Sequence, residues 1–170
     1  MKKRRAVLAL GLGGIVAGTF GFLLAHRHEA TESLEESLPI ISIRTSDGEV
    51  FSSEDLSARM VIINFWATWC EPCRTEIPLL IGLHALHAPQ VAVIGIAIDN
   101  PESVRIFEDE IGLDYVSLVG ETEGMSLMAQ FGNPGHLPFT LVFDQTGKLR
   151  HQKTGEISGK DIDLWVRELL

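Results

Sequence analysis

One stretch of the sequence limits the possible folds more than any other. Residues 60–65 form a largely apolar run, rich in β-branched side chains, that leads toward Cys70 and Cys73. The run has the length and composition of a strand buried on both faces, and such strands occur in sheets covered by helices. Apolar residues recur with helical spacing after Cys73 and mark one face that includes Leu86, so a helix is predicted from Cys70 to His87. The only two cysteines of the chain are therefore expected where a buried strand passes into a helix.

This position predicts a separate chemical role for each cysteine. A cysteine in the first turn of a helix lies near unpaired backbone N–H groups and the positive end of the helix dipole, which stabilise its thiolate. Cys70 is therefore the candidate nucleophile. Cys73 lies about one helical turn later and can reach back to resolve a mixed disulfide formed by Cys70. The spacing predicts a pair that cycles between dithiol and disulfide.

The remaining pattern predicts an α/β domain. A second buried strand with a helix after it would form a parallel βαβ unit with the first strand and helix. Turn residues between apolar runs predict two hairpins, one near each end of the domain. The expected strands are 40–44, 50–51, 60–65, 91–98, 115–119, 139–143 and 148–154, and the expected later helices are 101–111, 122–131 and 158–170.

The N-terminal region predicts a membrane anchor. Residues 6–25 contain no charged side chain and would span about 30 Å as a helix, the thickness of a bilayer's hydrocarbon core. The four cations at positions 2–5 would keep residue 1 in the cytoplasm and place the remaining domain outside the cytoplasmic membrane. A cleaved signal peptide is the alternative, but Leu23 does not suit the small-residue cleavage site that would end at Ala25. We expect an anchor at 1–25, a polar linker at 26–38 and one domain at 39–170.

The charge balance excludes one class of partner. Setting aside the cations at positions 2–5 leaves 10 of the 14 basic residues against 23 acidic ones, a formal charge of −13. A domain this acidic does not attract nucleic acid or anionic lipid through charge. It suits a domain that meets basic partners, although the acidity also serves solubility.

The segment Phe65-Trp-Ala-Thr-Trp-Cys-Glu-Pro-Cys73 resembles the active site of thioredoxins. The Glu71-Pro72 insert and Glu76 resemble the membrane-anchored thiol-disulfide reductases of the TlpA/ResA type. The resemblance covers residues 39–170. It implies a thioredoxin fold, a central mixed sheet flanked by helices, with an N-terminal β-hairpin extension and a preceding transmembrane helix.

The same resemblance implies an activity and a set of partners. It implies a reductase of disulfides in exported proteins, often serving cytochrome c or oxidase maturation, that works without a bound cofactor. In an oxidising compartment the disulfide must be reduced again after each cycle. The resemblance implies that a membrane thiol carrier does this with electrons from cytoplasmic thioredoxin. The direction, reductase rather than oxidase, rests on the resemblance.

Further site residues follow from the resemblance. Residues 135–140 match the thioredoxin loop in which a cis-proline faces the cysteines, so Pro138 is expected to be cis and the Leu137 backbone to pair with an extended substrate. The remaining predicted substrate contacts beside and between the cysteines are Trp69, Glu71 and Pro72. His136 is interpreted as a surface histidine.

A base is needed to remove the Cys73 proton. Thioredoxin has a buried aspartate before its Phe-Trp pair, whereas this chain has Asn64, which cannot titrate. Glu76, one helical turn after Cys73, is the predicted substitute. An ordinary solvated helix glutamate is the alternative interpretation of Glu76.

Two closely spaced thiols also serve other kinds of chemistry. Zinc would need His84 or His87, yet Cys73 and His84 on one helix lie about 16 Å apart, whereas zinc ligands converge within about 2.0 to 2.3 Å of the ion, so no metal is expected. Haem attachment needs a histidine where Arg74 stands. A peroxidase is compatible with the fold but not with the tryptophan-flanked cysteine pair. A non-catalytic copper-delivery or chaperone module, with both thiolates on Cu(I), is the rival function.

Overall fold

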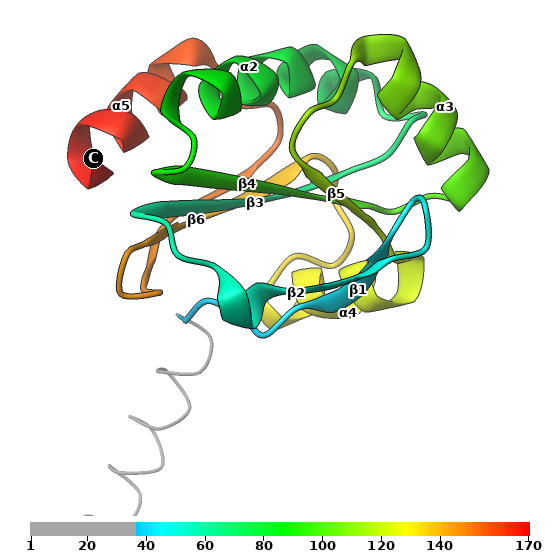
Figure 1. Ribbon diagram of the computed structural model, residues 1–170, viewed down its shortest axis with the longest axis horizontal. Coiled ribbons are helices and arrows are strands. Elements are labelled where there is room, and N and C mark those ends of the chain that lie inside the picture. The colour runs from blue at the N-terminus through cyan, green and yellow to red at the C-terminus, as the bar shows by residue number, and fades with distance from the viewer. Residues whose placement is uncertain (1–36) are drawn as a thin grey trace, which may run out of the picture. The chain divides into compact units, whose positions relative to one another are not determined.

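Seven strands form one mixed sheet in the order β2-β1-β5-β4-β3-β6-β7 (Figure 1). The computed structural model describes residues 37–170, so the predicted anchor at 1–25 and most of the predicted linker lie outside the described residues. The strands are β1 (Ser42–Thr45), β2 (Val50–Ser52), β3 (Met60–Trp66), β4 (Val91–Ala97), β5 (Val116–Val119), β6 (Phe139–Asp144) and β7 (Leu149–Thr154). The helices are η1 (Ser53–Asp55), α2 (Glu71–His87), α3 (Pro101–Ile111), α4 (Glu121–Gln130) and α5 (Gly159–Leu169).

The predicted central strand lies in the middle of the sheet. β3 pairs in parallel with β4 and antiparallel with β6, and every residue of β3 is buried. The parallel pairing of β3, β4 and β5 requires crossover connections, and α2 and α3 provide them. Figure 1 shows α2, α3 and α5 on one face of the sheet and α4 on the other. The predicted α/β architecture is confirmed.

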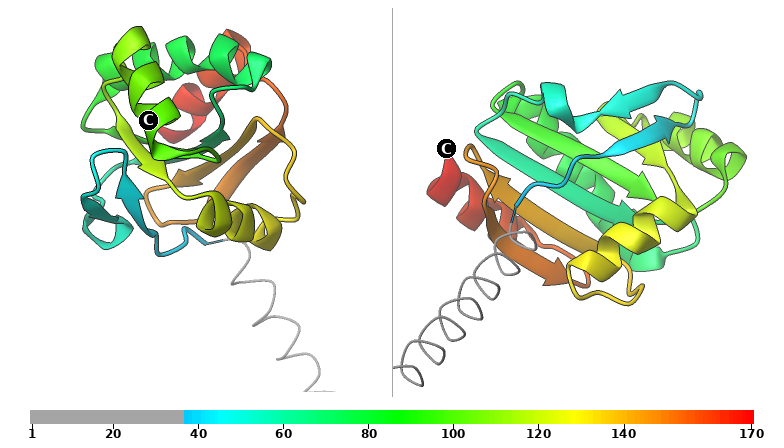
Figure 2. Two further views of the ribbon diagram at one scale, coloured as in Figure 1. Left: turned by 90° about the vertical axis from the view of Figure 1, so that its right-hand side faces the viewer. Right: turned by 90° about the horizontal axis from the view of Figure 1, so that it is seen from below.

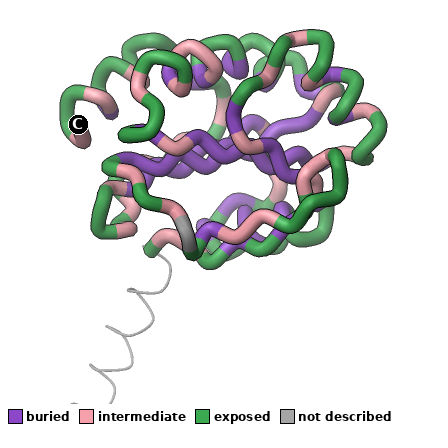
Figure 3. The backbone as a smooth tube through the Cα atoms, viewed as in Figure 1, coloured by how far each residue is buried: buried purple, intermediate pink, exposed green. Residues whose placement is uncertain are grey.

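Packing on both faces of the sheet accounts for the run of apolar residues in β3. Because side chains alternate along a strand, Ile63 and Phe65 join the core on the α4 face, whereas Met60 and Ile62 pack with Leu80 of α2. The central strands are accordingly buried along their length (Figure 3). One prediction about the core is wrong. Helical spacing puts Leu86 on the apolar face of α2, but its side chain is 80% exposed.

The N-terminal hairpin extends the sheet at one edge. β1 pairs antiparallel with β2 and also with β5, so the predicted hairpin forms two outer strands (Figure 2). Ser37 pairs with Lys148, and the Leu38 amide donates to the Gly147 carbonyl. Within residues 37–170, no helix has the length and apolar character needed to cross a membrane.

Gly95 of β4 is required by a close approach of side chains. A Cβ atom added at Gly95 would lie 2.9 Å from Trp66 Nε1 and 3.2 Å from Tyr115 Cε2, and both rings are buried. We expect Gly95→Ala to lower the free energy of unfolding by about 1 to 3 kcal/mol, because overpacking displaces these rings. Urea denaturation measures the effect.

Gly82 of α2 provides the matched control. A Cβ atom there meets nothing within 4 Å, so Gly82→Ala should raise the free energy of unfolding by up to about 1 kcal/mol through helix propensity. Equal effects of the two substitutions would contradict this account of Gly95.

Candidate active site

The two cysteines form a disulfide at the beginning of α2. Their sulfur atoms are 2.01 Å apart and their Cα atoms 5.2 Å apart. Cys70 is the N-cap residue of α2, and the Cys73 amide N–H donates to Cys70 Sγ at 3.3 Å. Pro72 occupies the first turn, where its missing N–H removes no helical hydrogen bond. Cys70 retains 6% exposure and Cys73 none, so Cys70 is the one that an incoming sulfur can reach.

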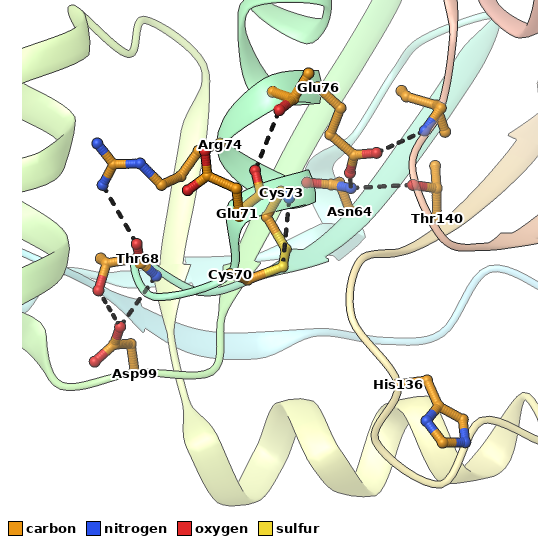
Figure 4. The surroundings of a disulfide bond; sticks show 12 residues. Asn64, Thr68, Cys70, Glu71, Cys73, Arg74, Glu76, Asp99, His136 and Thr140 are labelled. Carbon is orange, nitrogen blue, oxygen red and sulfur yellow. Dashed lines mark hydrogen bonds between the residues drawn. A yellow bond between two sulfur atoms is a disulfide. The ribbon is translucent and has the colours of Figure 1, made fainter.

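The loop between β3 and α2 is held by a side chain that the sequence did not single out. Asp99, which follows β4, accepts hydrogen bonds from the Thr68 amide at 3.1 Å and the Thr68 hydroxyl at 2.5 Å (Figure 4). The ends of adjacent parallel strands meet at one edge of a sheet, and this is why residues 31 positions apart come together. The signal that could have found Asp99 is its position just after the second predicted strand.

Arg74 is attached to the same loop. Its guanidinium donates to the Thr68 carbonyl at 3.3 Å and lies 4.7 Å from the centroid of the Phe107 ring on α3. The guanidinium therefore braces the first turn of α2 against α3 through a hydrogen bond and a cation–π contact.

Glu76 is fully buried behind the disulfide. One of its oxygens accepts from the Asn64 side-chain amide and the other from the Ile157 backbone N–H, both at 2.7 Å. Removal from water raises the pKa of Glu76 to about 7, although both hydrogen bonds oppose the rise. Glu76 is therefore not the solvated helix glutamate of the alternative interpretation, and its pKa lies where proton exchange near neutral pH is possible.

Asn64 connects Glu76 to the strand that follows Pro138. Its side-chain amide donates to Glu76 and also to the Thr140 hydroxyl at 3.0 Å. An asparagine here supplies two donors to acceptors that an ionised aspartate would repel or leave unpaired. Asparagine at position 64, where thioredoxin has an aspartate, therefore goes together with the carboxylate of Glu76, to which it donates.

The proline loop lies beside the disulfide, as expected. The Leu137–Pro138 peptide bond is cis, and Pro138 is buried. Leu137 is half-buried and packs against the apolar cluster that contains Cys70 and Cys73. A second cis bond precedes Pro89.

The other predicted contacts differ in their accessibility. Trp69 is 70% exposed beside the disulfide, and Glu71 and Pro72 are also exposed. Trp66 is fully buried and belongs to the core. His136 is exposed and lies apart from the cysteines (Figure 4). The structure therefore presents Trp69, Glu71 and Pro72 on the surface around the disulfide.

The two histidines considered for zinc lie at the far end of α2. His84 and His87 occupy its last turn, whereas Cys70 caps its first. Among residues 37–170, no three His, Cys, Asp or Glu side chains gather closely enough to hold a metal ion.

Comparison with known proteins finds thioredoxin-like proteins and thiol-disulfide oxidoreductases. The profile of the AhpC/TSA family matches residues 34–152. The chain is 30% identical over 132 residues to the thioredoxin-like protein YneN of Bacillus subtilis, covering 75% of each chain. It is 26% identical over 174 residues to the thiol-disulfide oxidoreductase ResA of Bacillus thuringiensis, covering 99% of each.

A solved structure shows the same fold. The crystal structure of a thioredoxin-family thiol:disulfide interchange protein from Chlorobium tepidum superposes with a TM-score of 0.69 at 28% identity. The match covers 79% of this chain and 95% of that one. With a disulfide at the helix N-cap and a cis-proline loop beside it, the chain belongs to the thioredoxin-like AhpC/TSA family and is a thiol-disulfide oxidoreductase of the TlpA/ResA type.

Proposed function

We propose that this protein reduces disulfides in exported proteins through a Cys70/Cys73 cycle. The observation that carries the proposal is the disulfide at the N-cap of α2, in which Cys70 keeps 6% exposure and Cys73 has none. Oxidoreductases of this type run in either direction according to their potential and partners. The reductase direction is supported by the likeness to the TlpA/ResA type.

The cycle transfers two electrons in two exchanges. In the dithiol form, the Cys70 thiolate attacks one sulfur of a substrate disulfide, which forms a mixed disulfide and releases a substrate thiolate. The Cys73 thiolate then attacks Cys70 Sγ, releases the second substrate thiolate and closes the Cys70–Cys73 disulfide. A dithiol partner must return two electrons to the site, and a membrane thiol carrier would supply them.

Glu76 is proposed to take the Cys73 proton in the second exchange. It lies one helical turn from Cys73, it is buried, and its pKa is about 7. Such a pKa lets the carboxylate accept a proton and then release it near neutral pH. Asn64 and the Ile157 amide hold the carboxylate in place.

An extended substrate is proposed to dock between the proline loop and the exposed residues around the disulfide. Leu137 would offer its backbone to a short added strand, with Pro138 fixing the loop beside the cysteines. Trp69 offers an exposed aromatic surface, and Glu71 and Pro72 complete the rim. Substrates of this kind include apocytochrome c and oxidase-assembly proteins.

The proposed location is the outer side of the bacterial cytoplasmic membrane, with residues 6–25 as a single anchor. The alignment with ResA over 99% of this chain supports a shared N-terminal extension. Mass spectrometry of the mature N-terminus checks this, because an N-terminus after Ala25 would contradict the anchor.

Trapping in cells tests the function. In a Cys73→Ser variant, the mixed disulfide on Cys70 cannot be resolved, so clients should accumulate and be identifiable by mass spectrometry. The matched control is the Cys70→Ser, Cys73→Ser double variant, which should capture none of them. Exported proteins with paired cysteines are the expected clients; a set confined to cytoplasmic proteins would contradict the proposal.

A further inference from the structure

A buried asparagine lies in the loop from α4 to β6 (residues 131–138). Asn133 is 3% exposed, although its chain neighbours Gly132 and Pro134 are exposed. Its backbone N–H donates at 3.0 Å to the carbonyl of Met128, in the last turn of α4. Buried polar side chains are nearly always hydrogen-bonded, so the partners of this side chain identify its role.

The Asn133 side chain binds three backbone groups of its own loop. Its Oδ1 accepts from the Gly135 amide at 2.9 Å and from the His136 amide at 2.7 Å, and its Nδ2 donates to the His136 carbonyl at 3.0 Å. Asparagine suits this place because its short side chain offers an acceptor and a donor together. Both polar backbone groups of His136 are therefore held by one side chain.

A second contact fixes this loop to α4. Gly135 has a φ angle of +118°, and a Cβ atom added there would lie 2.7 Å from Met125 Cε. Met125 of α4 therefore packs directly on the glycine, where no side chain fits. The loop is thus joined to α4 at both Asn133 and Gly135.

The backbone groups on either side of Leu137 are occupied. His136 is bound to Asn133, and the Pro138 carbonyl accepts from the Gly155 amide at 2.8 Å. Within residues 37–170, no hydrogen bond joins the amide or the carbonyl of Leu137 to another protein group. The side chain of Leu137 packs against the apolar cluster that contains both cysteines. Its N–H and C=O are therefore the groups that remain for an added strand.

Peptide planarity connects Asn133 to these two groups. The His136 carbonyl and the Leu137 N–H belong to one planar peptide group and point in opposite directions, because that peptide bond is trans. The hydrogen bond from Asn133 to the His136 carbonyl therefore also sets the direction of the Leu137 N–H, away from Asn133.

We propose that Asn133 is a positioning residue for substrate docking. It holds the peptide group between His136 and Leu137 so that the Leu137 backbone is presented to an extended substrate segment beside the disulfide. This inference rests on the proposed function, since it concerns the docking of the same disulfide substrates. Asn133 does not contact either sulfur, so its effect is on substrate binding and not on thiol exchange.

Single-turnover reduction by the dithiol form of the full chain tests the proposal. Asn133→Leu keeps a side chain of similar volume and removes all three hydrogen bonds. Its apparent KM for an extended disulfide-containing peptide should rise at least about tenfold, with the maximal rate within about twofold, because docking is lost before the chemical step. Reduction of bis(2-hydroxyethyl) disulfide, which has no peptide backbone to pair, should stay within about twofold.

A second measurement tests the backbone pairing itself. Peptides are N-methylated in turn at the two residues beside the reactive cysteine, which removes one N–H donor at a time. At one of these positions the KM of the unaltered protein should rise about tenfold. In Asn133→Leu the same methylation should change KM by less than about twofold, because the pairing is already lost.

Two further variants separate positioning from general stability. Gln152 donates to the Phe131 carbonyl at 3.0 Å, at the beginning of the same loop, and Gln152→Leu should leave KM within about twofold. Asn133→Asp keeps the acceptor for the two amides but lacks the donor to His136, so its KM should lie between those of the unaltered protein and Asn133→Leu. If Asn133→Leu does not fold, the N-methylated peptides are compared on Asn133→Asp, where a smaller penalty than in the unaltered protein is expected.

Three results would overturn the proposal: an unchanged KM in the Asn133 variants, an equal loss with the small disulfide, or an equal rise in Gln152→Leu. An N-methylation penalty that is the same with and without Asn133 would also overturn it. Absence of reduction by the unaltered protein would instead contradict the proposed function. The same peptides are then compared as dithiols that the Cys70–Cys73 disulfide oxidises, since docking is required in both directions.

Discussion

Cys70→Ser should reduce the catalysed reduction of a protein disulfide to the uncatalysed background, while Cys73→Ser should form a stable mixed disulfide without turnover. The two results differ because Cys70 makes the first attack and Cys73 resolves its product. Cys70 keeps 6% exposure and Cys73 has none, so only Cys70 can meet a substrate. Turnover of a disulfide substrate and mass analysis of the trapped adduct measure the two outcomes.

This pair of variants also separates the enzyme from the copper-delivery alternative. A non-catalytic module would show no turnover in the unaltered protein, and each substitution would instead remove one ligand of Cu(I). Turnover like that of the unaltered protein in both variants would remove the proposed mechanism.

For Glu76 we expect a dependence of stability on pH that Glu76→Gln abolishes. The pKa rises from 4.5 in an unperturbed glutamate to about 7 in the fold, so between these pH values the folded protein holds a proton that the unfolded chain has lost. The contribution is fully present below pH 4.5 and is lost as pH rises through about 7. The loss amounts to about 3 kcal/mol. Urea denaturation of the oxidised protein across this range measures it.

The Glu76→Gln variant and the unaltered protein are compared by how steeply the free energy of unfolding changes with pH, and not by its absolute value. Glutamine keeps only one acceptor for the two donors, Asn64 and the Ile157 amide, so the variant loses a hydrogen bond at every pH. Glu71→Gln, on the exposed side of the same helix, should leave the slope in place because Glu76 is retained. Asp144 and Asp161, whose pKa values are lowered to about 2 by hydrogen bonds, titrate below this range in every variant.

The same variant tests the proton transfer. Without a carboxylate near Cys73, resolution of the mixed disulfide should slow by about a hundredfold at neutral pH. Stopped-flow kinetics of the second exchange report this step alone. An unchanged rate and an unchanged pH dependence of that rate would contradict the role of Glu76.

The sequence predicted most of the elements because their signals are local. The β-branched run at Met60, the turn at Asp144–Gly147 and the proline-flanked helix starts each depend on neighbouring residues. Leu86 was misplaced because helical spacing specifies a face, whereas its 80% exposure depends on where the neighbouring elements end.

The sequence by itself determined which two sulfur atoms react, since a Cys-x-x-Cys pair at a helix start brings them together through one turn of backbone. It also indicated the proline loop through the resemblance carried by its residues. Only the tertiary structure decided that Glu76 is buried between Asn64 and Ile157 and that Asp99 holds Thr68. These contacts join residues far apart in the chain, and their pKa values and pairing depend on burial, which no local pattern specifies.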